Sequence, residues 1–191
     1  MELGTPKLNR ANFACTRVFW NANQKVKVSG RTMDLFIDDD PRMTVLTNEP
    51  TLDEHLEELK RYQPFGGELQ IPCGIDPASR FVRAASFLKT LPEPLDEREA
   101  LAFLRGVMLR APTPFGAQDT SGSGSSNVGP TCWLVLYELT KRTIYFMGCA
   151  NLNPFQVNLS NIDFNEQTSM LQINPMNPEL SGEVSRKFTP P

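Results

Sequence analysis

The sequence predicts an α+β fold, because strand patterns lie toward both ends of the chain and helical patterns lie between them. Short apolar runs with strand character fall within residues 14–48 and again within 131–173. Three segments with helical spacing of apolar residues lie between 51 and 109. Strands and helices that are separated along the chain in this way are typical of α+β proteins.

The composition is that of an ordinary globular protein and argues against two classes of partner. The chain has 191 residues, of which 40% are hydrophobic and 21% charged, with a net charge of −3. No stripe of Lys and Arg is present to neutralise phosphates, so we expect no binding to nucleic acid. No apolar run approaches the roughly 20 residues that a membrane-spanning helix needs, so we expect no membrane association.

The N-terminal strand patterns predict a hairpin that brings a cysteine close to an arginine and an aspartate. A polar turn at 21–23 separates the two apolar runs, and Arg31 and Asp34 follow the second run. The hairpin returns these two residues to the neighbourhood of Cys15. A guanidinium can stabilise a thiolate, so Cys15 is a candidate nucleophile. The alternative for a strand cysteine beside aromatic residues is a small buried side chain.

The first predicted helix begins at a capping box formed by Thr51 and Glu54. Its apolar residues fall on one face as far as Tyr62. His55 lies at the border of that face, and we expect it to be partly buried with a structural role.

Two further helices are predicted, at about 79–89 and 95–109. Arg80 and Arg83 stand three positions apart in the first of them, beside a largely apolar run. One of the two arginines can extend to solvent while the other points at the edge of the sheet. The helix at 95–109 begins with an acidic capping pattern.

The remaining chain predicts strands and loops. The Ser- and Gly-rich segment 120–127 resembles a flexible linker, because no Lys-Ser/Thr pair follows its glycines as a phosphate loop would need. Besides the hairpin, strands are predicted at 43–48, 131–139, 143–148, 155–159 and, more weakly, 169–173. Residues 1–14 are expected to be a leader and 175–191 an extended tail around a domain at 15–174.

The cysteines and the histidine indicate no metal site and no cofactor. The four cysteines show no metal-ligand spacing, and the single His55 leaves no second histidine to complete a site. The presence of a single histidine also argues against a papain-like cysteine protease with a catalytic Cys–His pair. A substitute base is the α-amino group of Cys15, if the chain is cut after Ala14, since its pKa of roughly 7.7–8.0 suits a general base. Residues 1–14 lack an apolar region and are not a convincing secretory signal, which favours a cytoplasmic location.

Three ordered motifs resemble the choloylglycine hydrolase family, which contains bile salt hydrolases and penicillin V acylases. The first is Ala-Cys-Thr-Arg with Ser-Gly-Arg-Thr-Met-Asp, over 14–34. The second starts with Val-Leu-Thr-Asn-Glu-Pro-Thr at 45–51, and the third is Asp-Pro-Ala-Ser-Arg-Phe-Val-Arg-Ala at 76–84. The segment 131–164 is similar to the closing strands of the family.

This resemblance implies hydrolysis of linear amide C–N bonds of small acyl amides. Cys15 would be the nucleophile, with its own amine as base once residues 1–14 are removed. Asn48 would donate a hydrogen bond to the oxyanion. Arg31 and Asp34 would position the amine and the thiolate.

The resemblance also implies roles for the third motif and a fold. Arg80 would order the site, while Arg83 would face solvent. The fold would be the four-layer αββα sandwich of N-terminal-nucleophile hydrolases, here reduced to about one antiparallel sheet with one helical layer.

The spacing of the motifs departs from the family. Only 48 − 34 = 14 positions separate Asp34 from Asn48, where the family has a segment as large as a small domain. We expect that segment to be missing between about 40 and 43, through a shortened gene model, a degenerate copy or a natural variant. The alternative function is therefore an inactive family member with a structural or interaction role, which could form a homo-oligomer through an uncovered sheet.

Overall fold

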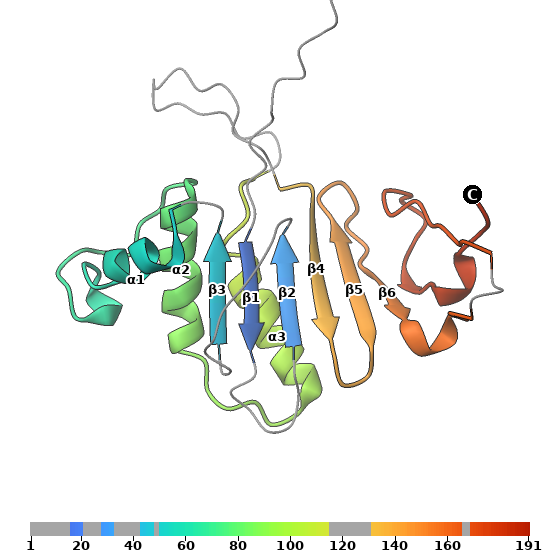
Figure 1. Ribbon diagram of the computed structural model, residues 1–191, viewed down its shortest axis with the longest axis horizontal. Coiled ribbons are helices and arrows are strands. Elements are labelled where there is room, and N and C mark those ends of the chain that lie inside the picture. The colour runs from blue at the N-terminus through green and yellow to red at the C-terminus, as the bar shows by residue number, and fades with distance from the viewer. Residues whose placement is uncertain (1–15, 21–27, 33–42, 48–49, 115–130, 166–168) are drawn as a thin grey trace, which may run out of the picture.

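A computed structural model of the chain shows an α+β fold (Figure 1). The residues that it describes are 16–20, 28–32, 43–47, 50–114, 131–165 and 169–191. The strands are β1 (Thr16–Trp20), β2 (Val28–Thr32), β3 (Met43–Thr47), β4 (Trp133–Glu138), β5 (Thr143–Gly148), β6 (Phe155–Asn158) and β7 (Gly182–Glu183). The α-helices are α1 (Leu52–Leu59), α2 (Pro77–Lys89) and α3 (Glu97–Met108), and 3₁₀ turns occupy η1 (Gln63–Phe65), η2 (Leu159–Asn161) and η3 (Ser185–Lys187).

The strands form one seven-stranded sheet in the order β3-β1-β2-β4-β5-β6-β7. Every neighbouring pair is antiparallel except β6 and β7, which are parallel. The sheet is therefore mixed, and our prediction of a wholly antiparallel sheet is wrong at this edge. The physical reason is that the chain between β6 and β7 returns to the end where β6 began, so β7 runs in the same direction.

The helices α2 and α3 pack against one face of the sheet. Helix α2 contacts β3 and β1, and α3 contacts β1, β2 and β4. Figure 1 shows α3 behind β1 and β2 and α2 beside β3, with α1 farther out at the same edge. This arrangement confirms the α+β class.

Helix α1 begins as predicted. The backbone N–H of Thr51 donates to the Glu54 carboxylate at 2.9 Å, and the N–H of Glu54 donates to the Thr51 hydroxyl at 3.5 Å. This reciprocal pair is the expected capping box. The helix ends at Leu59, before Tyr62. The His55 ring is fully buried and stacks on Phe81 of α2, with ring centroids 4.2 Å apart.

Helix α2 begins two residues earlier than predicted because Pro77 occupies its first position, where a missing N–H costs nothing. Asp76 caps this helix, and its carboxylate accepts the Ser79 N–H at 2.8 Å. Burial alone would raise the pKa of Asp76. Hydrogen bonds from Ser79 and the charge of Arg80 outweigh burial and hold the pKa of Asp76 below its ordinary value.

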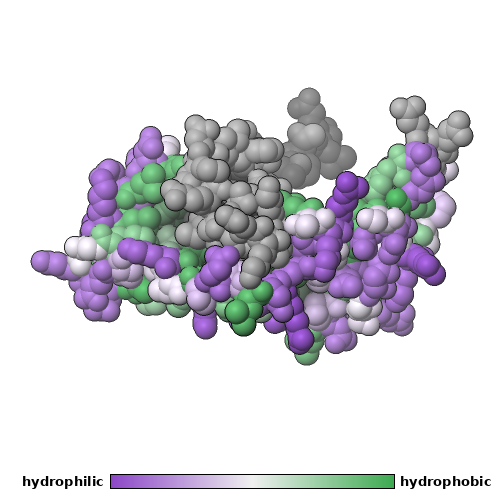
Figure 2. Space-filling model, turned by 90° about the horizontal axis from the view of Figure 1, so that it is seen from below, coloured by the Kyte–Doolittle hydropathy of each residue, from purple (hydrophilic) through white to green (hydrophobic). Residues whose placement is uncertain are grey.

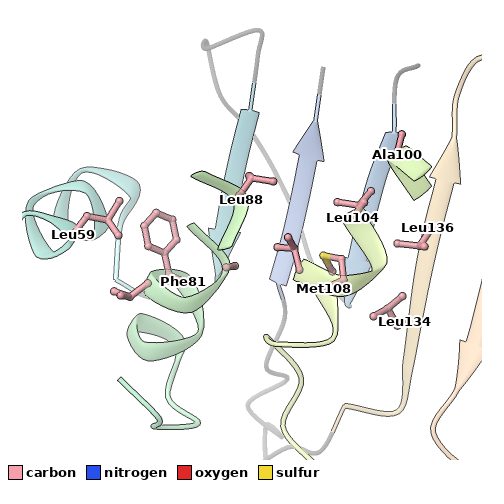
Figure 3. Packing of buried hydrophobic residues seen from close by; sticks show 11 residues of the cluster. Leu59, Phe81, Leu88, Ala100, Leu104, Met108, Leu134 and Leu136 are labelled. Atoms are coloured by element: carbon pink, nitrogen blue, oxygen red, sulfur yellow. The ribbon is translucent and has the colours of Figure 1, made fainter. Parts of the chain in front are cut away.

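The main core lies between the helices and the sheet. In α3, the buried residues recur with helical spacing on one face. On β4 and β5, the opposed pairs Leu134–Met147 and Leu136–Tyr145 pack against the same cluster. Figure 3 shows this core running from Leu59 of α1 through α2 and α3 to β4.

A second apolar cluster covers the C-terminal part of the sheet. Phe155 and Val157 of β6 pack with Leu180 and Val184. The segment 175–191, predicted as an extended tail, thus lies against β6 and includes β7 and η3. The strand predicted at 169–173 is present only as one bridge between Gln172 and Thr189, so that prediction is wrong in extent.

The face of the molecule seen from below is mainly polar. Figure 2 shows hydrophilic residues over much of the view from below, interrupted by smaller hydrophobic areas. Within the described part of the chain, no helix combines the length and the apolar character needed to cross a membrane.

We expect truncation of Leu104 to reduce the stability of the fold strongly, because this side chain of α3 is fully buried. Leu104→Ala should lower the free energy of unfolding by about 3 kcal/mol, through lost transfer energy and a residual cavity. Urea denaturation measures the change. Leu152→Ala is the matched control, because Leu152 is 96% exposed and should change stability by less than about 0.5 kcal/mol. Equal losses in the two variants would contradict this packing.

The cap of α2 predicts a pH-dependent contribution from Asp76. Because the folded state lowers its pKa, the stabilisation is present above the unfolded pKa of roughly 3.9 and is lost as pH falls through the folded value. Asp76→Ala should cost about 1 kcal/mol at neutral pH. Urea denaturation as a function of pH should show the wild type and this variant converging below about pH 3.9. Asp76→Asn retains a capping oxygen and should show a smaller loss at neutral pH; a pH-independent gap between the wild type and Asp76→Ala would refute the charge contribution.

Candidate functional site

The candidate site lies at the end of the sheet where three strand termini meet. Thr16, the first residue of β1, pairs with Thr32 at the end of β2 and with Thr47 at the end of β3. We call these residues the threonine row. Because β1 is antiparallel to both neighbours, its start and their ends lie at one edge, the upper end of the sheet in Figure 1.

Four of the five predicted site residues are within two sequence positions of the residues in this row. Arg31 is the penultimate residue of β2, and its backbone lies opposite Arg17 of β1. Cys15, Asp34 and Asn48 lie outside the described residues. In the sequence, Cys15 directly precedes the row, Asn48 directly follows it, and Asp34 comes two positions after it.

The fifth predicted residue, Arg80, lies in the first half of α2, which packs against β3 and β1. Its side chain is almost fully buried, with 1% of its surface exposed. A buried guanidinium is rare in proteins, and its charge contributes to the lowered pKa of Asp76. Arg80 is therefore a buried positive charge on the helix that packs against β3 and β1.

Arg83 does not face solvent as we expected. Its guanidinium donates to the carbonyl oxygens of Pro72 at 3.2 Å, Gly74 at 2.5 Å and Arg110 at 2.9 Å. Burial lowers the pKa of Arg83, although an arginine stays protonated at any ordinary pH. This one side chain joins α2 to the loop before it and to Arg110, two residues after the end of α3.

Sequence reasoning missed this tether, because the acceptor carbonyls lie between 9 and 27 positions away from Arg83. Backbone carbonyls carry no sequence signal of their own. The only local feature that could have suggested a buried role for Arg83 is its position, three residues after Arg80 on a mostly buried helix.

A pair of threonines joins the end of the helical segment to the start of β4. The N–H of Thr131 donates to the Thr113 carbonyl at 3.0 Å, and the N–H of Thr113 donates to the Thr131 hydroxyl at 3.1 Å. Val135 of β4 pairs with Arg31 of β2, so β4 starts at the same end of the sheet as the threonine row. The segment 115–130, with the Ser- and Gly-rich stretch, lies outside the described residues.

The described residues hold no cluster of three or more histidine, cysteine, aspartate or glutamate side chains suited to a metal ion. A surface hollow of about 370 Å³ lies on α1, on a different element from the threonine row. Its lining consists of four carboxylates and an arginine: Asp53, Glu54, Glu57, Glu58 and Arg61. The chemistry predicted from the sequence does not use these side chains.

Comparison with known proteins identifies relatives for most of the chain. The family model of the linear amide C–N hydrolases, choloylglycine hydrolase family, matches residues 39–171. This range contains Asn48 and Arg80 and begins after the other three candidate residues. A penicillin V acylase from Pectobacterium atrosepticum is 26% identical over 162 residues, which cover 76% of this chain and 42% of that protein.

The fold is shared with a solved relative. The structure of penicillin V acylase from Agrobacterium tumefaciens matches with a TM-score of 0.65 and 21% identity, over 86% of this chain and 53% of that chain. This chain thus spans about half the length of the relatives that it matches. Because the family model covers more than half of the chain, the chain belongs to the choloylglycine hydrolase family of linear amide C–N hydrolases.

Proposed function

We propose that this chain hydrolyses the C–N bond of small linear acyl amides, with Cys15 as an N-terminal nucleophile. The observation that carries the proposal is the threonine row. The strand ends that adjoin Cys15, Arg31 and Asn48 in the sequence meet there at one end of the sheet. Family membership supports the reaction class. The resemblance of the 14–34 segment to the family's N-terminal motif supports the choice of nucleophile.

The proposed reaction has two halves. The Cys15 thiolate attacks the amide carbonyl carbon, and the Asn48 side chain donates a hydrogen bond to the oxyanion that forms. The C–N bond then breaks, the amine leaves with a proton, and the acyl group remains as a thioester. Water attacks the thioester, releasing the carboxylic acid and regenerating the thiol.

The base in this proposal is the α-amino group of Cys15 itself. It becomes available when the peptide bond after Ala14 is cleaved, and it then takes the thiol proton. The Arg31 guanidinium stabilises the thiolate, and Asp34 accepts hydrogen bonds from the amine or from Arg31. Arg80, which is buried on the helix that packs against β3 and β1, orders the site.

A finer assignment of the fold goes with this proposal. We infer that the sheet and its helical layer are one sheet and one helical layer of the αββα sandwich of N-terminal-nucleophile hydrolases. The match to about half of a solved penicillin V acylase chain supports this inference. Bile salts or penicillin V would then be the nearest substrate types, as in bile salt hydrolases and penicillin V acylases.

A second candidate function is favoured by the partial length of the chain relative to its relatives. Since the chain spans about half the length of its relatives, a family member without activity, which acts as a structural or interaction protein, is the alternative. Loss of a single oxyanion donor typically costs about 100- to 1000-fold in rate, so an incomplete site can abolish measurable turnover. Such a protein could form a homo-oligomer through an uncovered sheet face.

The nucleophile assignment predicts that Cys15→Ala removes activity. Release of an amine from a panel of acyl amides should fall by about a thousandfold or more, because no other group in the proposed site can form the thioester. Cys73→Ala is the matched control, since Cys73 is exposed in the loop before α2 and should leave the rate within about twofold.

Two results would decide between the candidates. Equal amine release by the wild type and Cys15→Ala would place the chain with the inactive alternative. Mass spectrometry of an active preparation should show cleavage after Ala14, and intact Met1 in a protein that still hydrolyses amides would contradict the amine as base.

A further inference from the structure

We propose that Cys132 and Cys149 are a redox-sensitive pair, which closes to a disulfide when the protein meets a small-molecule disulfide such as oxidised glutathione. The pair lies on neighbouring strands of the sheet. The β4–β5 ladder ends at the opposed residues Trp133 and Gly148, and the next residue outward on each strand is a cysteine. The N–H of Cys149 donates to the Cys132 carbonyl at 2.9 Å, so the two backbones stay paired at this position.

The backbone spacing suits a disulfide. Opposed residues of an antiparallel ladder have Cα atoms roughly 4.5–5.5 Å apart. Native disulfides join Cα atoms that are roughly 4.4–6.8 Å apart. Cys132 and Cys149 lie one position beyond this ladder and are joined by a backbone hydrogen bond, so at ladder spacing a disulfide requires only rotation of the two side chains.

Exposure distinguishes these cysteines from core residues. Both are in the thiol form and both are partly exposed, whereas Leu134 and Leu136, farther along β4, are buried. A buried cysteine usually acts as a small apolar side chain, but a partly exposed one can be reached by a soluble oxidant. The third described thiol, Cys73, is exposed in the loop before α2, on a different element from the ladder.

The chemistry is thiol–disulfide exchange in two steps. One protein thiolate attacks a sulfur of oxidised glutathione, forms a mixed disulfide and releases one glutathione thiolate. The second protein thiolate then attacks the protein-side sulfur of the mixed disulfide and releases the second glutathione. The protein dithiol loses two electrons and two protons, and one oxidised glutathione becomes two reduced ones.

The position of the pair gives oxidation a structural consequence. Cys132 directly follows Thr131, whose N–H and hydroxyl hold Thr113 at the end of the helical segment. A disulfide to Cys149 would fix the start of β4 to the end of β5 covalently, at the end of the sheet that carries the threonine row. The inference does not depend on amide hydrolysis, because Cys132 and Cys149 have no part in the proposed reaction.

The test equilibrates the full chain with glutathione buffers of graded reduced-to-oxidised ratio. After acid quenching and alkylation with N-ethylmaleimide, intact mass counts the remaining thiols and peptide mapping locates any cross-link. We expect the chain to lose two alkylation sites together as the buffer becomes more oxidising. The cross-linked peptide should contain Cys132 and Cys149, while Cys73 stays alkylated. Four alkylated thiols at every ratio, or a cross-link that joins Cys73 to another cysteine, would overturn the proposal.

Single substitutions provide the control. Cys132→Ser and Cys149→Ser should each abolish the internal disulfide. Cys73→Ser should leave the internal disulfide unchanged. Should either of the first two variants fail to fold, the wild-type peptide map still decides the question. An internal cross-link that persists in Cys132→Ser would contradict the assignment.

Discussion

The pairing of β1 with strands on both of its sides is the constraint on which the candidate site depends. Thr16 faces Thr32 across one ladder and Thr47 across the other. Backbone hydrogen bonds between antiparallel strands set this register. Residues that are far apart in the sequence are brought together here because β3, which follows β2 along the chain, pairs on the other side of β1.

The helical layer holds these strands from one side. Helix α2 packs against β3 and β1, and α3 reaches from β1 across β2 to β4. Arg83 joins the two helical segments by donating to Arg110 and to the loop before α2. Arg80 therefore lies on a helix that these hydrogen bonds connect to the preceding loop and to the chain just after α3.

Local features of this fold could be predicted from the sequence, whereas long-range ones could not. The capping box of Thr51 and Glu54 and the cap of α3 at Asp96 involve residues three positions apart, so their signals are complete within one turn of helix. The parallel pairing of β7 with β6 joins residues more than 20 positions apart and has no such signal. The strand predicted at 169–173 failed for the same reason, because only Gln172 finds a partner, in Thr189.

The candidate site likewise has features that could be predicted from the sequence and features that could not. The motifs around Cys15, Asn48 and Arg80 could be recognised from sequence, and the structure supplies the strand register that relates two of their flanking strands. The carbonyl tether of Arg83 could not be recognised, because its acceptors are backbone atoms of distant residues. The relation between the chain and its relatives is likewise partial, since it spans about half of their length.

The most direct test is whether Cys15 lies near position 48, as a site built on the pairing of Thr16 with Thr47 requires. Asn48→Cys would place a second thiol there, at a spacing of about 5 Å between Cα atoms if the ladder continues by one residue. Mild oxidation followed by peptide mapping should find a disulfide between Cys15 and the introduced thiol. Free thiols at both positions, or a cross-link from position 48 to Cys73, would contradict a site built on the threonine row.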